Sequence, residues 1–248
     1  MILITGPGRS GTTVLALLYR ELGFDPGGVW RDDTRSGLED PEIVALNEAI
    51  IDAVGLTPMG APGGIRKRIR RAGKALIPSS YQSRLRSRLR ALPWMESAQP
   101  GLLDWPRLEA ATSRFGSRLT AMGASHAVAK DPRFLWTLPV WAASGVALEH
   151  VAIAFRNLDA SVTSRGQIDS LRFRTEGAAR NSIVYGFGLA LWTLEERGIP
   201  HSIVHFPAFL EAPTELYRAL RFPEPVSEQA FAEALARVRR PELIHHSA

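Results

Sequence analysis

The first 22 residues contain the pattern that most constrains how this chain of 248 residues folds. Residues 1–5 form an apolar run with β-branched side chains, which is typical of a buried strand. The run ends at Gly6-Pro7-Gly8. Apolar residues then recur at helical spacing over residues 12–22, before a glycine suited to a C-terminal helix cap. The chain is therefore predicted to open as a strand, a glycine-rich turn and a helix.

The same alternation of strand and helix continues to the end of the chain. Three further apolar runs predict buried strands, at residues 127–129, 151–155 and 202–205. Helical periodicity occurs over residues 41–54, 108–122, 134–143, 160–167, 178–197, 214–220 and 227–238, and residues 24–38 are predicted to form a loop. Because apolar strands separated by helices indicate a parallel sheet buried on both faces, we predict an α/β fold. It consists of a parallel-sheet, P-loop-type core with helices on both faces, plus a basic, mostly helical insertion.

The positive charge of the chain is concentrated in one segment. The formal net charge is +5, but residues 66–90 hold ten of the 30 Lys and Arg residues and no acid, so the remainder carries 20 basic against 25 acidic residues. A basic balance confined to one segment argues against general nucleic-acid binding. We predict a single domain over residues 1–248, with the basic insertion at about residues 57–106. The segment from Arg66 to Arg90 would form solvated helix faces, a mobile lid that recruits an anionic acceptor, or a peripheral contact with an anionic membrane surface.

Composition excludes several classes of site. The chain has no cysteine, which rules out disulfides, thiolate-bound zinc, iron–sulfur clusters and a cysteine nucleophile. No apolar run approaches the ~18 residues that a membrane span needs, and the first residues lack the pattern of a signal peptide. We therefore expect a cytoplasmic location.

The glycine-rich turn is the strongest candidate for a binding site. It reads Gly6-Pro-Gly-Arg-Ser-Gly-Thr-Thr13, between a strand and a helix, which is the context that a phosphate-binding loop requires. Backbone N–H groups, the helix N-terminus, the Arg9 cation and three hydroxyl groups would all favour an anion. The phosphate-binding candidates are Gly8, Arg9, Ser10, Gly11, Thr12 and Thr13. Thr12 occupies the position of the lysine in nucleotide-triphosphate loops, which counts against hydrolysis of ATP or GTP.

This loop resembles the 5′-phosphosulfate loop of the sulfotransferases that use 3′-phosphoadenylyl sulfate (PAPS). Many members carry Lys at the Arg9 position, and a large bacterial branch carries Arg. The resemblance implies a second loop for the 3′-phosphate, in which a strand ends in Arg with a Ser eight positions later. Arg156 and Ser164 keep this spacing, without the usual Asp-Pro after the Arg, and Ser161 and Thr163 are alternative hydroxyls nearby. Arg239 and Arg240 resemble the basic tail that the family places near the nucleotide.

The resemblance also implies catalytic roles. Lys130 follows the second strand, where the family has a lysine, and together with Arg9 it would stabilise the charge that develops on the bridging oxygen. Pro132 stands where the cytosolic branch has its histidine base, so we expect a carboxylate to serve instead. Glu39, in a string that resembles a bacterial motif, is the first candidate, with Asp33 and Asp131 behind it. Favourable electrostatics at a helix start would explain Glu39 equally well.

These residues predict a PAPS-dependent sulfotransferase that needs no metal. The sulfuryl group would move to a hydroxyl or amine of a small-molecule, carbohydrate or lipid acceptor, and adenosine 3′,5′-bisphosphate (PAP) would be released. Two other classes stay open. One is a nucleotide or small-molecule kinase with a degenerate loop, which would require magnesium. The other is a non-catalytic nucleotide-binding protein.

Overall fold

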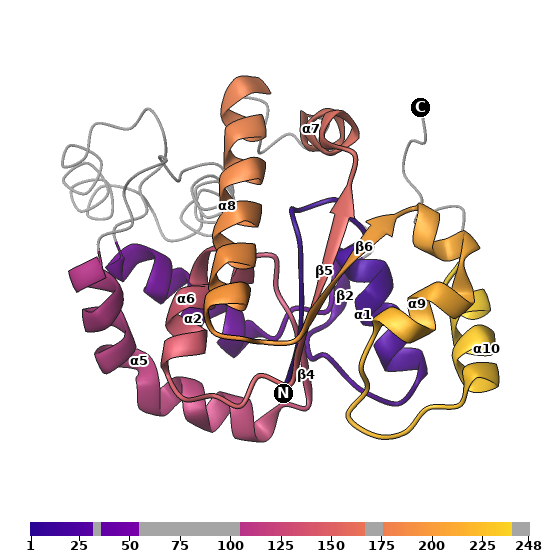
Figure 1. The fold of residues 1–248 in the computed structure, drawn as a ribbon, viewed down its shortest axis with the longest axis horizontal. Coiled ribbons are helices and arrows are strands. Elements are labelled where there is room, and N and C mark those ends of the chain that lie inside the picture. The colour runs from indigo at the N-terminus through magenta and orange to yellow at the C-terminus, as the bar shows by residue number, and fades with distance from the viewer. Residues whose placement is uncertain (32–35, 55–104, 167–175, 240–248) are drawn as a thin grey trace, which may run out of the picture.

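The computed structural model describes residues 1–31, 36–54, 105–166 and 176–239. Its centre is a sheet of four strands: β1 (Ile2–Thr5), β4 (Val128–Lys130), β5 (His150–Arg156) and β6 (His201–Phe206). The strands lie in the order β4-β1-β5-β6, and every pair is parallel. The predicted α/β class with a parallel sheet is therefore confirmed (Figure 1).

Helices cover both faces of this sheet, because alternate strand residues supply two separate cores. Leu3 of β1 packs in one core, whereas Ile2 and Ile4 pack in the other. The Leu3 core includes residues of α2 (Pro41–Ala53), α5 (Trp105–Ser125), α6 (Phe134–Ala143) and α8 (Glu176–Glu196). The opposite core includes residues of α1 (Thr12–Glu21), α9 (Pro213–Ala219) and α10 (Glu228–Val238). Figure 1 shows these two groups of helices to the left and to the right of the sheet.

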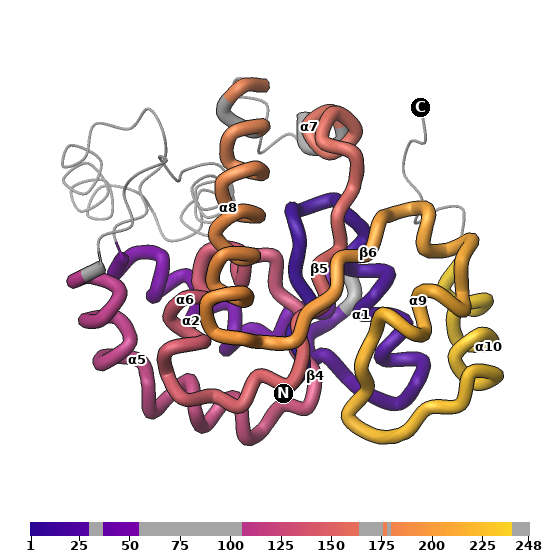
Figure 2. Tube along the Cα trace, in the orientation of Figure 1, coloured from indigo at the N-terminus to yellow at the C-terminus, as the bar shows by residue number. Residues whose placement is uncertain are grey.

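The chain leaves two adjacent central strands toward opposite faces. After β1 it enters α1, and after β5 it passes through α7 (Leu158–Gly166) toward α8 (Figure 2). In open α/β sheets, ligands bind beyond the carboxyl ends of the strands at such a reversal of direction. The glycine-rich loop between β1 and α1 lies at this edge. A Cβ added to Gly6 would lie 2.1 Å from the Ala154 carbonyl oxygen of β5, so only glycine permits this approach.

Four local differences from the sequence predictions concern segments next to the site or to the insertion. The segment 24–38, predicted as a loop, contains a short antiparallel pair, β2 (Trp30–Arg31) with β3 (Ser36–Gly37). Helix α5 begins at Trp105, inside the range predicted for the insertion, and α7 begins at Leu158, two residues earlier than predicted. A 3-10 helix, η2 (Ala208–Glu211), follows β6.

The basic segment from Arg66 to Arg90 lies outside the described residues, so its predicted roles stay predictions. Within the part of the chain that the structure describes, no helix is long and apolar enough to cross a membrane.

Candidate functional site

The loop between β1 and α1 adopts a backbone that glycine makes possible. Gly11, the residue before α1, has a φ of +93°, and a Cβ there would lie 2.6 Å from the ring of Phe206. Arg9 has a φ of +73°, an uncommon conformation for a residue with a side chain. The loop therefore packs closely against Ala154 near the end of β5 on one side and against Phe206 on the other. This packing holds its unusual backbone conformation in place.

Ser10 places a buried hydroxyl group inside this loop. The residue is fully buried, and its Oγ has no hydrogen-bond partner among the described residues. A buried hydroxyl without a partner costs about 1–3 kcal/mol, so such groups call for an explanation. An anion held at the start of α1 would provide acceptor oxygens for it.

Two arginines contribute positive charge at this site, Arg9 in the loop itself and Arg156 at the end of β5. Arg156, at the end of β5, is only 5% exposed, and its guanidinium lies 5.8 Å from the ring centroid of Phe206. Burial lowers the pKa of Arg156. Burial also lowers the pKa of Arg9, and the positive charge of Arg156 lowers it further. Anionic groups beside these two partly desolvated cations would offset their mutual repulsion.

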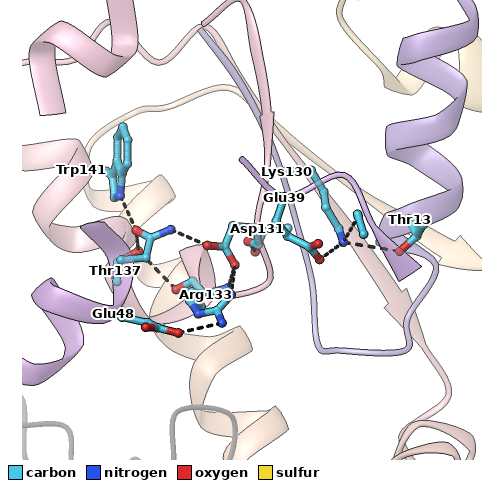
Figure 3. A network of polar contacts seen from close by, with 11 residues as sticks. Thr13, Glu39, Glu48, Lys130, Asp131, Arg133, Thr137 and Trp141 are labelled. Atoms are coloured by element: carbon cyan, nitrogen blue, oxygen red, sulfur yellow. Dashed lines mark hydrogen bonds and ion pairs between the residues drawn. The ribbon is translucent and has the colours of Figure 1, made fainter. Parts of the chain in front are cut away.

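Lys130 and Glu39 meet at the first turn of α1, as Figure 3 shows. The Lys130 ammonium forms an ion pair with Glu39 Oε1, although the two residues are 91 positions apart in the sequence. Its Nζ also donates to the Gly37 carbonyl oxygen at 3.0 Å and to Thr13 Oγ1 at 3.4 Å. An ammonium has three N–H donors, so these three partners account for all of them. The contact with Thr13 is the longest, and it is the one most easily exchanged for a ligand oxygen.

The backbone around Glu39 explains why its carboxylate reaches Lys130. Leu38 has a φ of +65° and is fully buried, in the core that α1 also contacts. A left-handed leucine is strained, and burial of its side chain in that core holds it in place. A Cβ at Gly28 would lie 2.1 Å from the Glu39 carbonyl oxygen, so the chain passes directly against Glu39 there.

Asp131, the rival base predicted after Glu39, is not available for that role. Its side chain is fully buried. One carboxylate oxygen accepts from Asn47 Nδ2 at 2.9 Å, and the other accepts from the backbone N–H of Arg133 at 2.9 Å and from its guanidinium at 3.1 Å. An acceptor cannot approach a carboxylate enclosed in this way. Asp131 is therefore a structural residue, and the prediction of it as an alternative base is wrong.

Asn47 is the residue of this region that the sequence predictions missed. It lies on α2 among buried apolar residues and is itself fully buried. A polar residue within the apolar stripe of a predicted helix was the available signal, because a buried amide needs partners. Its partners are Asp131, Thr137 and Trp141, all in Figure 3.

The remaining predicted residues are only partly placed. Ser164 lies in α7, within one turn of Ser161, which is fully buried and whose Oγ has no hydrogen-bond partner among the described residues. Arg239 is exposed and forms an ion pair with Glu211. Arg240 and Asp33 lie outside the described residues.

Comparison with known proteins gives no family for this chain. No protein-family model, no curated protein and no solved structure matches it. A functional assignment therefore depends on the chemistry of the site.

Proposed function

We propose that this protein is a PAPS-dependent sulfotransferase with a P-loop-type core. The observation that carries the proposal is the meeting of Lys130 and Glu39 at the first turn of α1, where the glycine-rich loop ends. In-line sulfuryl transfer requires a cation near the leaving oxygen and a base near the acceptor. A lysine and a carboxylate in contact beside an anion-binding loop would provide both.

The residues beside the loop suit a ligand with two separate anionic ends. The loop, with the buried Ser10 hydroxyl and Arg9, would hold the 5′-phosphosulfate. Arg156 would hold the 3′-phosphate, together with a hydroxyl from α7. Ser161 is the better candidate for that hydroxyl than Ser164, because its buried Oγ lacks a partner among the described residues.

The burial of the Lys130–Glu39 pair assigns a role to each member. Lys130 is 2% exposed, whereas Glu39 is 24% exposed, so the carboxylate is the member that solvent and an acceptor reach. The acceptor oxygen would form a bond to sulfur while the bond from sulfur to the bridging oxygen breaks. The electron pair of the broken bond would stay on the 5′-phosphate of PAP, beside Lys130 and Arg9. The acceptor proton would move to Glu39.

Ligand binding tests the two-ended site without any acceptor. PAP should raise the melting temperature well above the shift that AMP causes, since each charge-assisted hydrogen bond to a phosphate contributes about 1.5–3 kcal/mol. Arg156→Ala should abolish the difference between PAP and AMP. Arg237→Ala is the matched control, because Arg237 is half-exposed on α10 and pairs with Glu21. Equal shifts for PAP and AMP in the unmodified protein would contradict the 3′-phosphate assignment.

Turnover tests the transfer itself. With radiolabelled PAPS and a panel of hydroxyl and amine acceptors, label should appear in a product in the presence of a chelator. Label transfer from ATP that requires magnesium would instead indicate a kinase. Binding of PAP without turnover of any acceptor would indicate a non-catalytic nucleotide-binding protein.

A pair of serine variants separates the two hydroxyl candidates. Ser161→Ala should weaken PAP binding about tenfold and leave AMP binding unchanged, which corresponds to one hydrogen bond to a charged group. Ser164→Ala should change neither. The opposite pattern would return the role to Ser164.

A further inference from the structure

Asn47 ties helix α2 to two other elements through its side-chain amide. Its Oδ1 accepts a hydrogen bond from Thr137 Oγ1 at 2.8 Å and another from Trp141 Nε1 at 2.8 Å, both on α6. Its Nδ2 donates to Asp131 Oδ2 at 2.9 Å, at the end of β4. Asn47, Asp131, Thr137 and Trp141 are all fully buried. In a low-dielectric interior, such a buried hydrogen-bond network holds its members in one arrangement.

The backbone of Asp131 is hydrogen-bonded as well, so both its side chain and its main chain are fixed next to Lys130. Its backbone N–H donates to the Ile4 carbonyl oxygen at 3.1 Å, and its own carbonyl oxygen accepts from Thr5 Oγ1 at 3.0 Å. These contacts join the end of β4 to the end of β1. Any movement of α2 relative to Asp131 is therefore a movement relative to Lys130, the preceding residue.

Glu39 lies just before the start of the same helix. Glu39 directly precedes Asp40, whose carboxylate caps α2 by accepting from the N–H groups of Glu42 at 2.8 Å and Ile43 at 3.1 Å. The cap fixes the start of α2, and Glu39 is the residue directly before that cap, so a shift of α2 displaces the backbone next to Glu39. The next residue after Asn47, Glu48, forms an ion pair with Arg133, in which Glu48 Oε1 lies 3.2 Å from the guanidinium nitrogen. Figure 3 shows two neighbouring groups of contacts, one from Trp141 to Glu48 and the other from Glu39 to Thr13.

We propose that Asn47 is a positioning residue that holds the Glu39 carboxylate against the Lys130 ammonium. An amide is required at this place because it must accept from two donors and donate to a carboxylate at the same time. A carboxylate of the same shape would repel Asp131, and an apolar side chain would remove the hydrogen bonds that Asn47 makes with the buried Trp141 Nε1 and Asp131 Oδ2. The positioning of Glu39 against Lys130 can be tested whatever the protein does. The expected effect of Asn47 on turnover rests on the proposed sulfotransferase activity.

Chemical labelling of Lys130 tests the positioning without reference to activity. The variant is Asn47→Leu, and the matched control is Trp141→Phe, which removes one hydrogen bond from the same amide but leaves the contact between Asn47 and Asp131. Folded protein is acetylated at pH 7.5, and the modification of Lys130 is followed by mass spectrometry. We expect Asn47→Leu to speed acetylation of Lys130 about tenfold or more, because the pair opens locally. In Trp141→Phe the rate of Lys130 acetylation should stay within about twofold of the rate in the unmodified protein, because the contact between Asn47 and Asp131 is kept. Both variants are measured well below their melting temperatures, so that global unfolding does not contribute to the labelling.

A second variant keeps the test decisive if Asn47→Leu does not fold. Asn47→Asp keeps the shape of the side chain and places a second carboxyl group beside Asp131, so it should also expose Lys130 to acetylation about tenfold faster. Unchanged labelling of Lys130 in a folded Asn47 variant, or equal acceleration in Trp141→Phe, would overturn the proposal.

Kinetics separate this proposal from the proposed function. If the protein transfers sulfuryl groups, Asn47→Leu should lower kcat about 100-fold while the KM for PAPS stays within about threefold, since a displacement of about 1 Å at a reacting group has an effect of that size. If Lys130 is acetylated faster in the Asn47 variants but the protein turns over no acceptor, the positioning role of Asn47 is supported and the sulfotransferase assignment is removed. Normal kcat in an active, folded Asn47 variant would remove the positioning role and leave the assignment intact.

Discussion

The contact between Lys130 and Glu39 predicts that stability and activity respond differently to the same pair of substitutions. Lys130 is 2% exposed, so Glu39→Gln leaves a buried ammonium without a carboxylate partner. Breaking a buried pair costs about 3–5 kcal/mol, and because Glu39 is 24% exposed we expect a loss of about 2–3 kcal/mol. Lys130→Met leaves only the better-hydrated carboxylate unpaired, and the loss should be about 1–2 kcal/mol.

The double variant, which combines Glu39→Gln with Lys130→Met, distinguishes a structural ion pair from a catalytic one. Removal of both charges should return the free energy of unfolding to within about 1 kcal/mol of the unmodified protein, because a buried ion pair replaced by uncharged groups is often close to neutral. The coupling energy would then be about 2–5 kcal/mol, at or above the upper end of what contacting residues show. Activity should not return, since the double variant lacks both the cation and the base.

Urea unfolding followed by circular dichroism gives the four free energies, and PAPS-dependent turnover gives the four rates. Additive losses of stability would refute the contact on which the site is built. Recovery of activity in the double variant would show that the pair serves the fold alone.

Three further predictions follow from other contacts. Burial, aided by the positive charges of Arg221 and His201, lowers the pKa of His150 to about 4, so folding favours its neutral form. The free energy of unfolding should therefore be unaffected by His150 above pH 6.5. Between pH 6.5 and pH 4 it should fall by up to about 3 kcal/mol, because the unfolded state takes up a proton on this histidine before the folded state does. Urea unfolding of His150→Gln should lack that decline, and identical pH profiles would contradict the assignment. Gly28→Ala should displace the Glu39 backbone and lower kcat about tenfold or more with PAP affinity unchanged by calorimetry; a normal kcat would show that Glu39 does not depend on this contact. Gly11→Ala would bring a Cβ to 2.6 Å from the Phe206 ring, so PAP binding should fall about tenfold or more by calorimetry, and unchanged binding would contradict the role of the loop.

Most of the elements were predictable from the sequence because their signals are local. The helix over residues 12–22 is found as α1, and Asp40-Pro41 starts α2 as its capping residue and its first helical residue. Apolar runs located all four strands of the sheet, because strands covered on both faces are apolar throughout. The position of the glycine-rich loop, between strand and helix, was also predictable, since it depends only on neighbouring residues.

The tertiary structure alone decided which carboxylate meets Lys130. Glu39 and Asp131 were both candidates by sequence, and one lies in an ion pair that is partly exposed while the other is enclosed by Asn47 and Arg133. The choice depends on Leu38, whose side chain enters the core and holds a left-handed turn that sequence patterns do not predict for leucine.

The same limit applies to the partners of Asn47. Sequence periodicity reports which residues are buried, because burial recurs with the period of a helix or strand. It does not report which buried polar group meets which, because the contact with Asp131 spans 84 positions and depends on how α2, α6 and β4 pack together. The sequence thus determined the elements and the loop, and the packing of those elements determined the site.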